Sequence, residues 1–440
     1  MVPPASDAAT QSLELVVGEM TYGSAALART DEGQVVFVDD ALPGERVRAE
    51  VSSRRRNYLQ TRAVDILEAA PGRVPPPCRF VPECGGCQWQ HANYEQQLEM
   101  KLKVVAETLR RAGASAPAPE LVAAADPFRY RIRGEFHVVR PRSGGGRHQL
   151  GFNKRRTYDL VPVDDCLIHH PHITEALAGI GLALDDVGSG SLRSIRLTAH
   201  PNSRELLWRG LGGSPPKELQ DALSARLDNF LVHQDSLSIG YDGALIDGRP
   251  GDPLVFRVDS ETFVQVNHSQ AHKLYGCALS YIGDRPGALV EGYSGFGAIS
   301  ILAATRTDAA ARPTRVTMVE EARAAAILAR LHVRLHGVEQ SSVLAGRLED
   351  KLFQLEPDEV DTLVVDPPRA GCAPPVLAEV ARLHPRRMVY VSCDPSTLGR
   401  DLARLAAHGY RVEAQTLVDM FPQTYHIETV SLLVPGAQST

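Results

Sequence analysis

The chain has 440 residues, of which 43% are hydrophobic and 23% are charged, which is enough apolar content for two or three domains with cores of their own. The first ten residues lack the basic segment and apolar run of a signal peptide, and no stretch approaches the roughly 18 apolar residues of a membrane span. The net charge of −6 argues against non-specific coating of nucleic acid, but it leaves RNA binding through local basic patches open. We therefore expect a soluble, cytoplasmic monomer with no membrane partner.

Residues 8–70 predict a small all-β unit. Five short strand patterns are separated by turns: Leu13–Val17, Gly23–Ala28, Gln34–Val38, Glu45–Ser52 and Leu59–Leu67. Five strands in about 60 residues are typical of an oligonucleotide-binding barrel. On Leu15–Gly18 and Ala41–Glu45 the segment resembles a TRAM domain, an RNA-binding module. The run Arg54-Arg-Arg-Asn-Tyr58 suits single-stranded RNA through phosphate contacts and stacking, but a solvated turn explains it equally well.

The second predicted unit, residues 71–258, opens with a cluster of cysteines. Cys78 and Cys84 are separated by five residues, and two glycines separate Cys84 from Cys87. The glycines let the backbone bend tightly so that several thiolates can converge, and Cys166 would supply a fourth ligand from a distant strand. Four thiolates suit either an iron–sulfur cluster or a structural zinc ion, and chemistry alone does not separate the two.

The remainder of residues 71–258 predicts an α+β domain that binds RNA. Phe128–Phe136 alternates arginine with apolar residues, so one face of a strand would be buried and the other positive. A positive face suits RNA phosphates, and the alternative is a solvated face with paired carboxylates. We favour RNA because the basic residues are clustered and of one sign. His169, His170 and His172 are expected to be surface or capping residues rather than metal ligands.

Residues 259–440 alternate strands with helices, which predicts an α/β domain with a mostly parallel sheet covered on both faces. Ala288–Gly297 reads as a strand that ends in a glycine-rich turn, where a ligand can approach the backbone closely. A second strand, Val316–Glu320, ends in a carboxylate that can accept both ribose hydroxyls of a nucleoside cofactor. Together these features indicate a dinucleotide or S-adenosylmethionine.

Cys393 follows another predicted strand of this domain, Met388–Val391. Pro395 ends the strand because it cannot continue in the middle of a sheet. Cys393 therefore lies where α/β enzymes place their chemistry, although a lone cysteine is more often a small buried hydrophobe. On a neighbouring predicted strand stands Asp366-Pro-Pro-Arg369, a motif typical of methyltransferases that act on nitrogen or on bases.

Four motifs together carry a family resemblance: Cys78-x5-Cys84-Gly-Gly-Cys87, Asp366-Pro-Pro-Arg369, Ser392-Cys393-Asp394-Pro395 and His426-Ile-Glu428. In this order, over nearly the whole chain, they are similar to the RNA 5-methyluridine methyltransferase family. The resemblance implies a Rossmann-like, S-adenosylmethionine-dependent enzyme that methylates C5 of a uridine in rRNA or tRNA. It also implies that the cysteines bind a 4Fe–4S cluster and that a helix over residues 94–111 packs against the catalytic domain.

The resemblance further implies a role for each matched position. Cys393 matches the nucleophile, and Glu428 matches the base that removes the C5 proton, while Arg369 contacts the target base or positions its loop. The S-adenosylmethionine contacts fall on Gln265, Tyr293, Glu320 and Asp366. The four cluster ligands fall on Cys78, Cys84, Cys87 and Cys166.

Some positions depart from the family pattern. Ser294 stands where cysteine is usual, Ala298 where asparagine or threonine is usual, and Asp394 where asparagine is usual. Arg347 lies near the place of a polar cofactor contact. These changes bear on cofactor affinity and base choice. Two alternatives therefore stay open: an RNA cytosine-C5 methyltransferase, and a non-catalytic RNA-binding or folding factor on the same scaffold.

Overall fold

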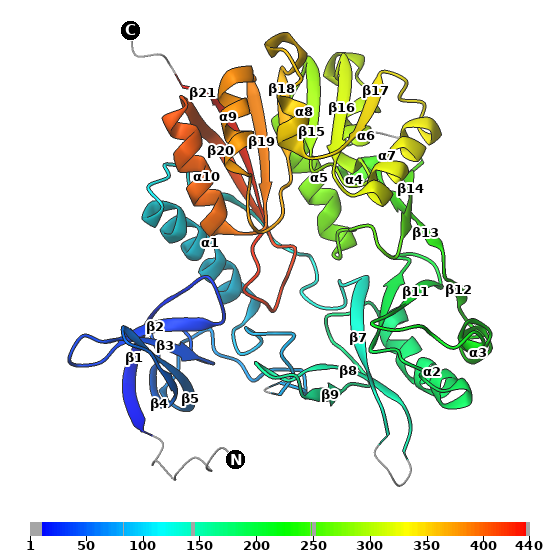
Figure 1. The fold of residues 1–440 in the computed structure, drawn as a ribbon. Coiled ribbons are helices and arrows are strands. Elements are labelled where there is room, and N and C mark those ends of the chain that lie inside the picture. Colours follow the sequence, from blue (N-terminus) through cyan, green and yellow to red (C-terminus); the bar gives the residue numbers. More distant parts are fainter. Residues whose placement is uncertain (1–10, 82, 142–145, 247, 249–251, 437–440) are drawn as a thin grey trace.

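The computed structural model describes residues 11–81, 83–141, 146–246, 248 and 252–436. Residues 8–10 and 437–440, at the ends of the predicted units, and residues 82, 142–145, 247 and 249–251 of the predicted central unit lie outside the described residues. The described chain has three main parts: a barrel, a central sheet with two helices, and a large sheet covered by helices (Figure 1). None of the described helices is both long and apolar enough to cross a membrane.

The first part is a closed barrel with the strand order β1-β2-β3-β5-β4. Its strands are β1 (Ser12–Met20), β2 (Ala25–Arg29), β3 (Val35–Asp39), β4 (Arg46–Arg54) and β5 (Tyr58–Glu68). β3 and β5 run parallel and all other neighbours run antiparallel. Leu15, Val36, Val38 and Val47 are buried and fill the interior, because alternate residues of a barrel strand point inward.

Helix α1 (Tyr94–Arg111) leads the chain from the barrel to the large sheet (Figure 1). It begins after Asn93, whose side chain accepts a backbone hydrogen bond from the first turn, as an N-cap residue does. The helix packs against α10 (Pro395–Ala407). The next strand, β6 (Glu120–Val122), pairs with β20 (Tyr410–Val418) at the edge of the large sheet. The chain therefore contributes to the large sheet before it builds the central part.

The central part is a six-stranded sheet with the order β12-β11-β10-β7-β8-β9. Its strands are β7 (Arg133–Val139), β8 (Gln149–Asn153), β9 (Leu160–Pro162), β10 (Ser194–Ala199), β11 (Glu205–Leu211) and β12 (Leu231–His233). Helices α2 (Pro171–Val187) and α3 (Leu219–Arg226) share an apolar core with it that includes Phe136 and Trp208. The connection to the large sheet contains β13 (Ser236–Tyr241), α4 (Gly243–Ile246) and β14 (Leu254–Asp259).

The predicted positive face of Phe128–Phe136 is wrong at Arg133. The strand begins only at this residue, and the side chain is buried. Its guanidinium donates to the Thr198 hydroxyl at 2.7 Å and to the Asp259 carbonyl at 2.8 Å, which compensates for the burial of a charge. Burial still lowers the pKa of Arg133 to about 10. This arginine therefore ties the central sheet to β14 and does not face RNA.

The third part is an eight-stranded sheet with the order β17-β16-β15-β18-β19-β21-β20-β6. Its remaining strands are β15 (Ala288–Gly292), β16 (Arg315–Glu320), β17 (Ser341–Ala345), β18 (Thr362–Val365), β19 (Arg387–Ser392) and β21 (Thr429–Pro435). The first five strands in this order are parallel, and β21 runs antiparallel to both of its neighbours. This arrangement is a Rossmann-like sheet with an antiparallel strand inserted near one edge.

Helices cover both faces of this sheet. They are α5 (His268–Ile282), α6 (Ala298–Ala304), α7 (Arg323–Leu335), α8 (Leu348–Leu352), α9 (Pro374–Leu383) and α10, with short 3-10 turns at Ala309–Ala311 and Pro357–Glu359. Successive residues of β19 belong to different cores: Met388 and Tyr390 pack with α1, α9 and α10, whereas Val389 and Val391 pack with α5 and α6. Because side chains alternate along a strand, a central strand covered on both faces is apolar throughout.

Candidate active site

The candidate site lies at the carboxyl edge of the large sheet. β15, β18 and β19 are parallel, so the residues that follow them, Tyr293, Asp366 and Cys393, emerge at the same edge. β21 runs the other way, and its Thr429 pairs with Ser392. Glu428 and Cys393 are therefore each one residue beyond this pair on adjacent strands. The sheet register brings together two predicted catalytic residues that are far apart in the sequence.

Glu320, at the end of β16, is bonded to the glycine-rich turn after β15. One carboxylate oxygen accepts from the N–H of Gly295 at 2.8 Å, and the other accepts from the N–H of Ala322 at 2.7 Å. The turn requires left-handed backbone at Tyr293, Gly295 and Gly297, with φ of 58°, 55° and 85°. The predicted cofactor contacts Tyr293 and Glu320 are thus linked through the backbone of this turn, and backbone donors orient the Glu320 carboxylate.

Acidic side chains gather beneath this turn. Glu291 is buried, and burial raises its pKa to about 8, with Asp366 and Glu320 adding to the effect. Asp366 is partly buried, and loss of solvent raises its pKa to about 6. Carboxylates that disfavour one another's charge are stabilised when a cation binds among them. The arrangement therefore favours a positively charged ligand.

Two buried polar atoms near the predicted cofactor positions have no hydrogen-bond partner among the described residues: the Gln265 side-chain oxygen and the Ser294 hydroxyl. Gln265 precedes Asn267, the residue that caps α5. Ser294 follows Tyr293 in the glycine-rich turn. Buried polar atoms in folded proteins are nearly always satisfied, so both are available to a ligand.

Cys393 lies between β19 and α10 and is partly buried. Burial, followed by the nearby Glu428 and Asp366, raises the pKa of its thiol to about 12, whereas Arg369 acts against the rise. The backbone carbonyl of Cys393 accepts a hydrogen bond from the Tyr22 hydroxyl at 3.1 Å. A residue of the barrel therefore contacts the candidate nucleophile, and the sequence contains no local signal for this contact.

Asp394, one of the departures from the family pattern, caps helix α10. Its carboxylate accepts from the N–H groups of Ser396 and Thr397 at 2.9 and 3.1 Å. Aspartate and asparagine cap helix N-termini about equally well. The exchange of asparagine for aspartate therefore preserves the local structure after Cys393 and adds a negative charge that raises the pKa of the thiol.

Glu428 is 4% exposed. Burial and then the charge of Asp366 raise its pKa well above the usual range, and Arg369 acts against them. The Arg369 guanidinium also lies 3.1 Å from a ring nitrogen of His426, and burial, followed by Arg369, lowers the pKa of His426 to about 4. The neutral imidazole can thus accept from Arg369. This contact joins Arg369 to the segment that carries Glu428, and its role in contacting the target base or positioning its loop stays a prediction.

The loop that precedes Glu428 is fixed by distant parts of the chain. The Lys101 ammonium pairs with the Asp419 carboxylate at 2.6 Å, and both side chains are fully buried. The Tyr130 hydroxyl donates to the Pro422 carbonyl at 3.0 Å. The Gln423 carbonyl accepts from the N–H groups of Gln88 and Trp89, both at 3.1 Å. Helix α1 and the segment that carries Cys78, Cys84 and Cys87, which we call the cysteine segment, together hold this loop against the sheet. Sequence reasoning missed these residues.

Comparison with known proteins identifies the family. The family model described as tRNA (Uracil-5-)-methyltransferase matches residues 246–435, and the TRAM domain model matches residues 11–64. An uncharacterized RNA methyltransferase of Caldanaerobacter subterraneus subsp. tengcongensis is 31% identical over an alignment of 453 positions, gaps included, which covers 96% of this chain and 98% of the relative. This chain belongs to the RNA uracil-5-methyltransferase family.

Further comparisons extend the likeness over the chain. An uncharacterized RNA methyltransferase of Streptomyces coelicolor is 31% identical over an alignment of 456 positions, gaps included, which covers 97% of this chain and 94% of the relative. The crystal structure of Pyrococcus abyssi tRNA (uracil-54, C5)-methyltransferase in complex with S-adenosyl-L-homocysteine has a TM-score of 0.70 at 22% identity, covering 96% and 100% of the two chains. The predicted TRAM barrel, methyltransferase fold and RNA uracil-C5 methyltransferase activity are confirmed.

The four cysteines predicted as ligands line one cavity of about 280 Å³. They are Cys78, Cys84, Cys87 and Cys166. Burial, and then the neighbouring thiols, raise the pKa of Cys87 to about 12, and burial raises that of Cys166 to about 11. Among the described residues, no three Cys, His, Asp or Glu side chains are grouped closely enough to hold a metal ion.

The histidine prediction is only partly correct. His170 caps helix α2, as expected of a capping residue. His169 is buried at 3% exposure, and a ring nitrogen lies 3.1 Å from the Cys166 sulfur. Burial lowers the pKa of His169 well below its usual value, so the ring is neutral and fixed beside the cysteine cavity. It is neither a surface nor a capping residue.

Proposed function

We propose that the protein transfers a methyl group from S-adenosylmethionine to C5 of a uridine in rRNA or tRNA, with Cys393 as nucleophile and Glu428 as base. The observation that carries the assignment is the register of β19 and β21, which places these two side chains on adjacent strand ends. They lie at the sheet edge that also carries the glycine-rich turn and Asp366.

The reaction needs a thiol because C5 of uracil is a weak nucleophile. Addition of the Cys393 sulfur to C6 forms a C–S bond and moves electron density to C5. Bound S-adenosylmethionine supplies the methyl group and the positive charge of its sulfonium. A thiol whose pKa is raised to about 12 is mostly protonated at neutral pH. A cation bound among Glu291, Glu320 and Asp366 would favour the thiolate by offsetting nearby negative charge.

Glu428 completes the cycle. After methylation, C5 carries both the new methyl group and its original proton, and removal of that proton lets the C–S bond break and the ring regain its double bond. A carboxylate with a raised pKa is a stronger base than an ordinary glutamate, and the pKa of Glu428 is raised by burial and by Asp366. Arg369, which opposes that rise, keeps the carboxylate form accessible.

We assign cofactor binding to Gln265, Tyr293, Glu320 and Asp366. The unpartnered Gln265 oxygen suits an amino group, and the Glu320 carboxylate, held by Gly295 and Ala322, suits ribose hydroxyls. Asp366 adds negative charge next to Cys393. The Pyrococcus abyssi enzyme, which has the same fold, was crystallised with S-adenosyl-L-homocysteine, and this supports the choice of cofactor.

We also propose that the cysteine cavity holds a 4Fe–4S cluster. A zinc ion lies about 2.3 Å from its sulfur ligands, so a single ion would leave most of a cavity of about 280 Å³ unfilled. A cluster offers a separate iron atom to each thiolate, so the four sulfurs need not converge on one point. Apolar walls that include Phe80 and Phe152 favour such a group over water. Bound there, it would cross-link residues 78–87 to Cys166.

Transfer of labelled methyl groups to RNA tests the proposal. Purified protein is incubated with tritiated S-adenosylmethionine and bulk tRNA or rRNA, and the labelled nucleoside is identified. Cys393→Ala should abolish transfer to uridine and leave S-adenosylmethionine binding intact. Cys277→Ser, which changes a cysteine of α5, is the matched control and should remain active. Retained turnover in Cys393→Ala, or label in cytidine instead of uridine, would refute the assignment.

A further inference from the structure

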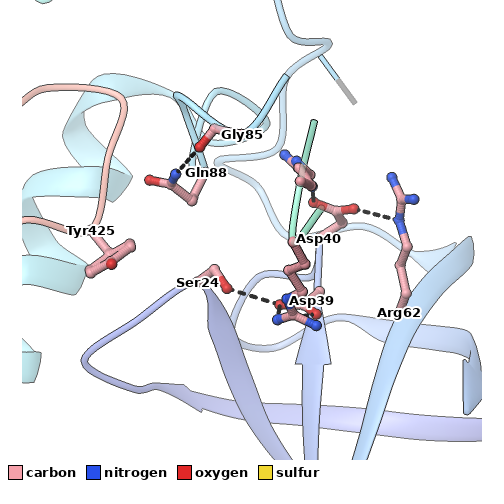
Figure 2. A pocket seen from close by; sticks show the side chains of 9 residues that line it. Ser24, Asp39, Asp40, Arg62, Gly85, Gln88 and Tyr425 are labelled. Carbon is pink, nitrogen blue, oxygen red and sulfur yellow. Dashed lines mark hydrogen bonds and ion pairs between the residues drawn. The ribbon is translucent and has the colours of Figure 1, made fainter. Parts of the chain in front are cut away.

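A cavity of about 280 Å³ lies where the barrel, the cysteine segment and the loop before Glu428 meet (Figure 2). We call it the joint cavity. The barrel contributes Asp39, Asp40 and Arg62, the β8–β9 turn contributes Arg156, and the loop before Glu428 contributes Tyr425. The methyl-transfer mechanism uses none of these side chains. The cavity nevertheless opens beside the segment that carries the candidate base.

The charged side chains that line the joint cavity form ion pairs, but the arginines among them keep N–H donors for a ligand. Arg156 contacts Asp39 at 2.7 Å, and Arg62 contacts Asp40 at 2.8 Å. A guanidinium has five N–H donors, and these two side chains are 52% and 48% exposed, so each can still bind a phosphate. Arg155 also pairs with Asp40, so three arginines face two aspartates. The net charge of the cavity is positive.

The Tyr425 ring forms the opposite side of the cavity from the two aspartates (Figure 2). Tyr22 packs edge-on against it, with ring centroids 5.8 Å apart, and His426 packs at 4.4 Å. Tyr22 also donates to the Cys393 carbonyl. The ring is therefore held in place by residues that touch both candidate catalytic segments, and one RNA strand can reach the cavity and Cys393 together.

We propose that the joint cavity binds one nucleotide of the RNA strand flanking the target uridine, with its base on Tyr425 and its phosphate on Arg62 and Arg156. The proposal deepens the proposed function and rests on the attack of Cys393 on that uridine. Carboxylates only accept hydrogen bonds, so Asp39 and Asp40 favour a base that carries an amino group. Cytosine, adenine and guanine carry one, and uracil does not.

Fluorescence anisotropy with labelled single-stranded octamers of cytidine and of uridine, without methyl donor, tests the proposal on the full-length protein. Tyr425→Leu should weaken binding of the cytidine octamer by about 5- to 140-fold, the range of one stacked base. Arg156→Ala should lower the slope of log affinity against log salt by about 0.7, as expected for one lost phosphate contact to a single strand. The wild type should bind the cytidine octamer more tightly than the uridine octamer.

Arg226→Ala is the matched control, because Arg226 forms an exposed pair with Asp186 on the central helices. It should leave RNA affinity within twofold of wild type. If Tyr425→Leu and Arg156→Ala also stay within twofold while their melting temperatures fall, the joint cavity is only a contact between domains and the proposal is wrong. Failure of the proposed function would appear separately, as methyl transfer retained by Cys393→Ala.

Discussion

Cys393 and the cysteine cavity are both thiol sites, and burial raises the pKa of Cys393 as it does that of Cys87 and Cys166 in the cavity, yet their surroundings differ. Cys393 lies among ionisable groups, with Glu428, Asp366 and Arg369 close enough to alter its pKa. The cavity thiols raise one another's pKa, and their cavity is lined by apolar side chains such as Phe80 as well as by the charged Arg131 and Asp165. A reacting thiol needs groups that take up and release protons, whereas a ligating thiol needs other thiols at fixed positions. The neighbours, not the pKa shift, separate the two roles.

The largest effects are expected when one cysteine of each site is replaced, because each replacement should abolish one property and leave the other intact. Cys87→Ser should remove the brown colour and broad visible absorbance expected of an iron–sulfur protein, because one of four ligands is lost, and it should preserve S-adenosylmethionine binding at the sheet edge. Cys393→Ala should keep the absorbance and lose methyl transfer. Absorbance spectra, iron content and cofactor titrations on the two purified variants measure both properties.

The distinction between the two sites is wrong if the two variants do not differ in visible absorbance and methyl transfer as expected. A colourless wild type that contains zinc would mean that the cavity holds the alternative metal. Loss of absorbance in Cys393→Ala would place that cysteine among the cluster ligands. Cys277→Ser, outside both sites, should leave absorbance and methyl transfer unchanged.

Glu428→Gln tests the candidate base that acts together with Cys393. The amide keeps the shape of the buried side chain but cannot take the C5 proton, so turnover should fall by about 10²- to 10⁴-fold. The bond from Cys393 to the methylated uridine should then persist. A protein–RNA adduct should appear on denaturing gels with Glu428→Gln and disappear when Cys393→Ala is added.

A surface variant supplies the control for this experiment. Glu413 lies on β20 and pairs with Arg411 at 2.7 Å, with about half of its side chain exposed. Glu413→Gln should turn over normally and form no stable adduct. If Glu428→Gln behaves like Glu413→Gln, another group removes the C5 proton.

Asp366→Asn should weaken cofactor binding and stabilise the folded protein. The pKa of Asp366 is raised from 3.8 to about 6, so the folded state binds its proton more tightly than the unfolded state. Its contribution to stability is complete below pH 3.8 and is lost as pH rises to about 6. At 1.36 kcal/mol per pKa unit the loss is about 3 kcal/mol, and we expect about 1–3 because the side chain is partly exposed.

Urea unfolding measures this effect directly. At pH 7 the free energy of unfolding of Asp366→Asn should exceed that of wild type, and the advantage should shrink near pH 4. S-adenosylmethionine affinity should fall at the same time, because a negative charge is lost. Asp358→Asn, at an exposed position, should change neither quantity. An unchanged or lower stability at pH 7 would show that the carboxylate is stabilised in the folded protein.

The sequence was most informative where function follows from local pattern and sheet order. Strands rich in β-branched residues, followed by Asp366 and Cys393, predicted that both would lie at the same edge of a parallel sheet. The pairing of Thr429 with Ser392 then brings Glu428 to that edge. Cys78, Cys84 and Cys87, which were grouped by their spacing, line one cavity together with Cys166, which was added from a distant strand.

Contacts between distant segments could not be predicted in this way. The buried pair of Lys101 and Asp419 joins residues 318 positions apart, and nothing local to either residue specifies the other. Arg133 fits the alternation of an exposed basic strand, but packing of the central sheet on β14 buries it. The hydrogen bond from Tyr22 to Cys393 depends on how the barrel docks. Domain arrangement therefore decides these roles.

The smallest predicted effect concerns that docking. Tyr22→Phe removes only the hydroxyl that donates to the Cys393 carbonyl at 3.1 Å and keeps the ring contact with Tyr425. One hydrogen bond contributes about 0.5–1.5 kcal/mol, so kcat should fall by about 2- to 12-fold. Tyr410→Phe is the matched control, since its buried hydroxyl donates to the Pro385 carbonyl at 2.9 Å away from the site. Both variants should lose similar stability in urea. If kcat falls equally in both, the barrel has no specific part in positioning the nucleophile; if only Tyr22→Phe is slow, docking of the RNA-binding barrel helps to set the geometry of the thiol.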